Sequence, residues 1–345
     1  LRASLPGRSA LALDGFLEHR ANGLHFDGNV LLNSASFAEF VKWSRAPIGN
    51  AADQQLAVPF SLTSSIRARP RSIELGNLKL RLAGASAQGS VNYNWIGRPA
   101  LIANIEADTL DLEKFGKDLL EPARIANWMG LLGDAPAGVK PAAPSATDLT
   151  LRLTANRISD GVRDLADVDI DLGRLDGALR LEKFNVTWQP GLKLALKGAL
   201  EKLTSTPTGE ITGTVTAADN TSGLHLAELL GLTAAAKLPP QSFAALTPLR
   251  LSISAITGQD IPNKSGRLAS NLVADGVIGS DRVRITASTD GPWRQWLGQP
   301  TQIQARITGD RAETTMRRLI GASNAVSLHN RKRSADDKTT RPKPA

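Results

Sequence analysis

The chain has 345 residues, no cysteine and a formal net charge of +8 at pH 7. The absence of cysteine excludes disulfide bonds and thiolate metal sites. Residues 331–345 hold six basic and two acidic residues, so half of the net charge belongs to this polar tail, which we expect to be disordered. Acidic and basic residues alternate along the rest of the chain, and we therefore expect no nucleic-acid partner.

The first predicted block covers residues 1–133. An opening hairpin is expected to turn at Asn22-Gly23, and Ser36 with Glu39 three residues later predicts the start of a short helix. A change of phase at Gly76-Asn77 predicts a β-bulge, and Leu110–Leu120 is predicted to form a second short helix. Strands are predicted near residues 9–19, 24–33, 55–65, 71–82, 86–96 and 100–107.

Two further blocks are predicted after a Pro/Ala/Gly linker at residues 134–147. Residues 148–236 are predicted to hold five strands and a helix that begins at Ser222, and residues 237–330 four strands and a helix at 312–320. The four strands of the third block are expected near residues 248–256, 266–275, 278–289 and 300–308.

The segment from Thr147 to Ala218 shows the two-residue alternation most clearly. Successive side chains of a strand point to opposite faces, so this pattern predicts a sheet with one apolar and one polar face. Asp176-Gly177 and Gln189-Pro190-Gly191 mark the reversals between strands. The expected fold class is mainly β, a long curved antiparallel sheet built from repeated strand blocks with a few short amphipathic helices.

Candidate sites for chemistry are weak. Asp167, Asp169 and Asp171 resemble the start of a calcium loop, but the glycine and glutamate that such a loop requires are replaced by Leu172 and Ala178. His19 and His25 lie symmetrically about the first turn, and we expect exposed cross-strand neighbours there and no metal site. With no nucleophile and base in a recognisable pattern, we expect no catalytic residues, no cofactor and no enzymatic activity.

Two stretches carry a resemblance to a known family. LADVDIDLGRLDGALRLEKFNVTWQPGLKLALKGAL, residues 165–200, and IEADTLDLEKF, residues 105–115, are similar to the AsmA family of bacterial envelope proteins, which includes TamB-like members and resembles bridge-like lipid transfer proteins. The resemblance implies a curved β trough in the periplasm that moves phospholipid between the inner and outer membranes and supports outer-membrane integrity. It also implies tethering to the inner membrane by an N-terminal helix, which would precede Leu1 in a longer protein. Envelope partner proteins are a further expectation from this resemblance.

The expected function is non-enzymatic lipid binding and transfer along the apolar face, because each methylene hidden from water contributes about 0.8 kcal/mol. The alternatives are a scaffold for outer-membrane proteins with a dry β core, or a surface β-repeat interaction module. The predicted groove lining consists of apolar residues at alternate strand positions: Leu151, Leu153, Val168, Ile170, Leu172, Leu179, Leu181, Val186, Leu192, Leu194, Leu196, Leu251, Ile253, Val283 and Ile285.

Overall fold

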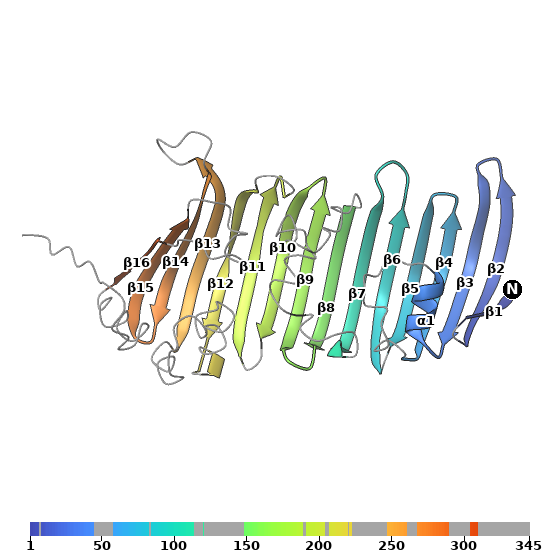
Figure 1. Cartoon of the computed structure of the whole chain (residues 1–345), viewed down its shortest axis with the longest axis horizontal. Coiled ribbons are helices and arrows are strands. Elements are labelled where there is room, and N and C mark those ends of the chain that lie inside the picture. Colours follow the sequence, from blue (N-terminus) through green and yellow to red (C-terminus); the bar gives the residue numbers. More distant parts are fainter. Residues whose placement is uncertain are drawn as a thin grey trace, which may run out of the picture.

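The computed structural model describes residues 1–6, 8–44, 58–82, 84–113, 120, 148–188, 191–203, 207–219, 221–222, 247–260, 268–289 and 304–309. These residues form one continuous open sheet of 16 strands and one short helix, α1 (Phe37–Ser44). Figure 1 shows the strands side by side from β1 at one end to β16 at the other. The predicted mainly β fold with one long open sheet is therefore confirmed.

The order of the strands in the sheet is their order in the sequence. All neighbours pair antiparallel except β7 and β8, which are parallel. Both of these strands therefore begin on the same side of the sheet, where the β6–β7 connection lies. The strands are β1 (Arg2–Leu5), β2 (Ser9–Arg20), β3 (Gly23–Ser34), β4 (Phe60–Arg69), β5 (Ser72–Leu82), β6 (Ala85–Asn94), β7 (Ala100–Asp111), β8 (Asp148–Ser159), β9 (Asp164–Leu175), β10 (Ala178–Trp188), β11 (Leu192–Glu201), β12 (Thr208–Ala217), β13 (Leu249–Asp260), β14 (Leu268–Ile278), β15 (Asp281–Thr289) and β16 (Gln304–Gly309).

The sheet continues across both borders between the predicted blocks, because β7 pairs with β8 and β12 pairs with β13. The predicted helix Leu110–Leu120 is wrong at its start, where the strand continues to Asp111 and Leu112 is not helical, and residues 114–119 lie outside the described residues. Leu110 and Asp111 belong to β7, where they pair with Ile158 and Ser159 of β8. The linker at 134–147, the helix at 312–320 and the tail at 331–345 lie outside the described residues.

Of three local predictions, one turn and one bulge are confirmed, and the position of the first turn is wrong. Asp176 and Gly177 have φ angles of 48° and 73°, the left-handed values that a primed hairpin turn needs between β9 and β10. The bulge in β5 is confirmed by a register shift between Leu75 and Leu78. The first hairpin turns one residue earlier than predicted, because Arg20 already pairs with Gly23.

Directly paired residues of neighbouring strands point to the same side of a sheet, so the pairing defines two faces. We call the side that carries Leu151, Ile170 and Leu194 the apolar face, and the opposite side the polar face. The polar face is crossed by ion pairs between neighbouring strands, including Arg67–Glu74 at 2.8 Å and Arg152–Asp171 at 2.9 Å. The charged side chains of these pairs are therefore held by their neighbours and remain in contact with water.

No second layer covers the sheet within the described part of the chain. The strands described make extensive contacts only with their neighbours in the sheet, and α1 adds the aromatic contacts of Phe37 and Phe40 with Phe60 at one edge. A sandwich would place a second sheet against the first. The described strands instead form a single open layer.

Candidate functional site

The candidate site is the apolar face, and the register places all 15 predicted lining residues on it. Leu151 pairs with Leu172, which pairs with Leu181. Leu194 pairs with Val186 on one side and Val215 on the other, and Val215 pairs with Leu251. The same pairing carries the face on to Val283 and Ile285 in β15. The lining is thus contiguous from β8 to β15.

The lining residues divide into two groups by exposure. Seven are half-buried: Leu151, Leu153, Ile170, Leu194, Leu196, Ile253 and Ile285. The other eight are buried: Val168, Leu172, Leu179, Leu181, Val186, Leu192, Leu251 and Val283. Most of them belong to one hydrophobic cluster together with Leu120, Ile158 and Trp188. The half-buried group is the part of the lining that a guest molecule can contact directly.

Charge is nearly excluded from this face. Among the strand residues whose side chains the structure describes, the register places one arginine, Arg174, and one acidic residue, Asp281, on the apolar face. Both lie at strand ends, next to turns. The central part of the face therefore offers only apolar, small or hydroxyl-bearing side chains, an environment that favours hydrocarbon over ions.

The hydroxyl groups buried on this face have partners within the protein. Ser9 donates a hydrogen bond to Ser34 at 2.7 Å, and Ser64 donates to the carbonyl of Gly76 at 2.8 Å. Thr257 and Ser270 share a hydrogen bond of 2.8 Å. Since buried polar groups are normally satisfied in this way, these hydroxyls do not require a polar ligand.

Asp160 is a buried residue with a structural role that the sequence analysis did not identify. Its fully buried carboxylate accepts hydrogen bonds from the backbone N–H groups of Leu120 at 3.0 Å, Val162 at 3.1 Å and Arg163 at 2.6 Å. Burial alone raises the pKa of Asp160, but the three N–H donors outweigh it and the pKa is lowered overall. Asp160 thereby fixes Leu120 against the hydrophobic cluster.

The polar motifs of the sequence are accounted for by neighbouring side chains. Asp169 pairs with Lys183 at 3.0 Å, and Asp171 pairs with Arg152, as expected for acidic residues on the polar face of a strand. His19 is exposed, but the two histidines are not cross-strand neighbours and His25 is not exposed, contrary to the prediction. His19 pairs with Leu24 on the apolar face, whereas His25 pairs with Glu18 on the polar face and is buried against Asn22. The described residues contain no group of three or more side chains suited to a metal ion.

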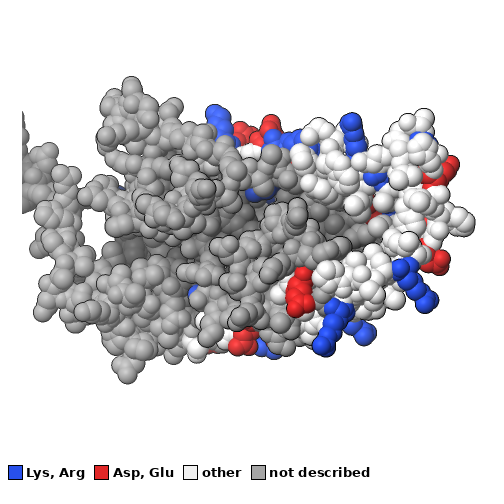
Figure 2. All heavy atoms as spheres, turned by 45° about the vertical axis from the view of Figure 1, so that its right-hand side comes forward, with Lys and Arg blue, Asp and Glu red and all other residues white. Residues whose placement is uncertain are grey.

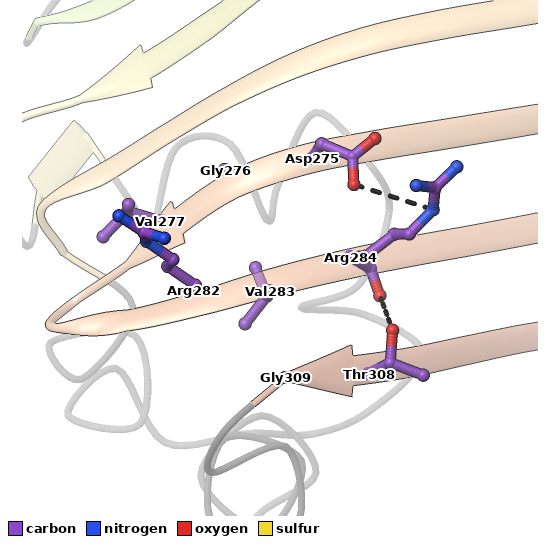
Figure 3. Close-up of a pocket in the computed structure, with 8 residues that line it drawn as sticks. All are labelled: Asp275, Gly276, Val277, Arg282, Val283, Arg284, Thr308 and Gly309. Atoms are coloured by element: carbon purple, nitrogen blue, oxygen red, sulfur yellow. Dashed lines mark hydrogen bonds and ion pairs between the residues drawn. The ribbon is translucent and has the colours of Figure 1, made fainter.

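Hollows in the described surface are open depressions between side chains. Figure 3 shows one of about 450 Å³ where β14, β15 and β16 lie side by side. Arg284 there approaches Asp275 at 3.6 Å, and its carbonyl accepts a hydrogen bond from Thr308 at 3.4 Å. Gly276, Val283 and Gly309 complete the apolar side of the hollow. It is a local dip in a long surface and lacks a buried reactive group.

Within the described residues, no helix combines the length and the apolar character needed to cross a membrane. Comparison with protein-family models, with curated proteins and with solved structures produced no match.

Proposed function

We propose that the chain binds lipid acyl chains along its apolar face and carries lipid along the sheet without catalysing a reaction. The observation that carries this proposal is a face that is apolar across the whole sheet and lies opposite a face of cross-strand ion pairs. An acyl chain laid on such a face hides its methylenes from water, and each contributes about 0.8 kcal/mol. A strip of this kind needs no specific recognition residue.

The dimensions of the sheet favour a path over a pocket. Sixteen strands in one sheet, spaced at about 4.8 Å, give a face on the order of 70 Å long. Because neighbouring strands follow the chain order, the apolar face continues from hairpin to hairpin. Such a face would hold several acyl chains in succession.

The resemblance of residues 105–115 and 165–200 to the AsmA family supports a more specific form of the proposal. In that form the chain acts in the periplasm, is tethered to the inner membrane in a longer protein, and carries phospholipid toward the outer membrane. Phospholipids are then its ligands, and envelope proteins are candidate partners.

The test uses two isoleucines of β7 that lie on opposite faces. Ile105 is half-buried on the apolar face, whereas Ile102 is 41% exposed on the polar face. We expect Ile105→Asp to reduce uptake of a fluorescent fatty acid at least fivefold and Ile102→Asp to leave it unchanged. A charge on the acyl path must be desolvated when lipid binds, whereas a charge on the polar face stays in water. Equal uptake by both variants would contradict the proposal.

A second candidate is a scaffold for outer-membrane proteins with a dry core, and the burial of eight lining residues favours it. Lipid mass spectrometry of the purified protein separates the two candidates. The lipid-carrier proposal predicts co-purified phospholipid, and the scaffold predicts clean protein that also takes up no fatty acid.

A further inference from the structure

Six large apolar side chains that are exposed to water gather at one edge of the N-terminal part of the sheet. Leu17 is 67% exposed, Leu24 58% and Ile96 61%, and Ile73, Tyr93 and Trp95 are each more than one-third exposed. We call these six residues the rim. They lie at the tips of the β2–β3 and β4–β5 hairpins and in the β6–β7 connection, along the upper edge in Figure 1.

The three tips form one continuous surface. A Cβ atom added to Gly23 in the first tip would lie 2.8 Å from the Pro70 ring in the second. Ile73 of the second pairs directly with Tyr93 beside the third, and the N–H group of Trp95 donates to the carbonyl of Arg71 at 3.0 Å. The rings of Tyr93 and Trp95 lie 5.5 Å apart. The rim is therefore a defined patch and not a set of scattered exposed residues.

The rim is also continuous with the apolar face. Leu17 pairs with Phe26, and Leu24, Ile73 and Tyr93 belong to the same face by their pairing. Phe16 is exposed nearby but points to the polar face. A hydrocarbon chain that passes from the rim onto the apolar face meets no layer of charged side chains on the way.

Basic residues flank the rim. The tip segments 16–27, 67–74 and 92–100 contain five arginines and three acidic residues. Arg98 also pairs with Asp148 at 2.6 Å and with Asp176 at 2.7 Å, so acidic and basic groups balance at this edge. Arg71 is exposed and takes part in none of the ion pairs that the structure shows among the described residues. Figure 2 shows basic and acidic side chains next to one another along the upper margin of the surface in view. Arg71 is therefore the arginine beside the rim that can interact with a negative group of a partner.

We propose that the rim docks into the interface of an anionic lipid bilayer, so that lipid passes from the membrane onto the apolar face. Tyrosine and tryptophan prefer the boundary between head groups and acyl chains, and arginine beside them interacts with lipid phosphates. A folded protein partner would also cover apolar side chains, but the exposed Arg71 and the paired rings of Tyr93 and Trp95 favour the lipid interface. This proposal rests on the proposed function, because it assigns the place where the acyl path opens to its source.

The test compares Ile96→Glu in the rim with Val162→Glu, since Ile96 and Val162 are both 61% exposed but lie at opposite edges of the sheet. Each protein is sedimented with vesicles of phosphatidylcholine alone and with vesicles that also contain phosphatidylglycerol. We expect the original chain to bind the anionic vesicles at least tenfold better than the neutral ones. Ile96→Glu should lose at least fivefold of that binding, and Val162→Glu should lose none.

The absence of cysteine allows a second readout. Ile96→Cys and Val162→Cys each place one environment-sensitive dye at a known edge. Anionic vesicles should shift the emission of the dye at position 96 to the blue and leave the dye at position 162 unchanged. An equal response at both positions, or none at either, would overturn the proposal.

Vesicle binding by the rim and fatty-acid uptake by the apolar face are measured separately, so either proposal can be contradicted without the other. In the absence of vesicles, Ile96→Glu should take up a soluble fluorescent fatty acid as the original chain does, whereas Ile105→Asp should not. Loss of vesicle binding with retained uptake supports the rim. Vesicle binding that survives Ile96→Glu overturns the rim proposal but leaves the acyl path intact.

Discussion

The apolar face differs between its two halves although both follow the same alternation. Across β2–β7 most of its side chains are half-buried or exposed, and the face includes glycine and serine, such as Gly15, Gly28 and Ser64. Across β8–β15 it carries larger side chains and contains the main hydrophobic cluster. Alternation therefore decides which face a residue occupies, whereas neighbouring side chains decide how much of it water reaches.

The paired glycines of β2 and β3 show how the first half differs. Gly15 pairs with Gly28, and a Cβ atom on either would collide with the backbone of the other strand. The backbones of the two strands thus approach closely where side chains are absent, and the apolar surface is recessed at this point. The second half also has glycines on this face, such as Gly213 and Gly276, but they pair with large side chains, Leu196 and Leu251. Side chains of the apolar face are therefore more accessible to water in the first half, and the second half contains more of the buried core.

The largest expected effect comes from a charge in the second half. Leu192→Asp places a carboxylate at a position with 0% exposure, and we expect it to lower the free energy of unfolding by about 4 kcal/mol or more. Leu75→Asp, at a half-buried position of β5, should cost about 1–2 kcal/mol, because its carboxylate reaches water. Urea denaturation of both variants measures the difference. Equal losses would remove the distinction between the halves.

Asp160→Asn should lower the free energy of unfolding by about 3 kcal/mol, because the buried backbone donors lose a charged acceptor. The pKa of Asp160 is lower in the folded state than in the unfolded state, so its contribution is present above the unfolded pKa and is lost as the pH falls through the folded pKa. Denaturation midpoints from neutral to acid pH should therefore fall less steeply in Asp160→Asn. An unchanged slope would show that the donors do not depend on the charge.

The smallest effect belongs to the polar face, where both halves are alike. Arg152→Gln breaks the ion pair with Asp171, in which the arginine side chain is 67% exposed, and should change the free energy of unfolding by about 0.5 kcal/mol. Uptake of fatty acid should not change. A loss of uptake in this variant would show that the polar face takes part in binding.

The sequence predicted the sheet, its two faces and most strands because alternation and turn residues are local signals. Asp176-Gly177 and the bulge at Gly76-Asn77 were found for this reason. Three features depend on contacts between distant residues and were missed: the short strand β1, the parallel pairing of β7 with β8, and the binding of Leu120 by Asp160. The rim was also missed, because exposure follows from how neighbouring hairpin tips are arranged.

Light-induced crosslinking with a diazirine-bearing fatty acid tests most directly whether the apolar face takes up acyl chains. Adducts are mapped to residues by peptide mass spectrometry. We expect them at half-buried positions of the apolar face, such as Ile105, Leu151 and Leu196, and not at polar-face positions such as Ile102. Adducts spread equally over both faces, or their absence from the apolar face, would contradict a lipid path along this sheet.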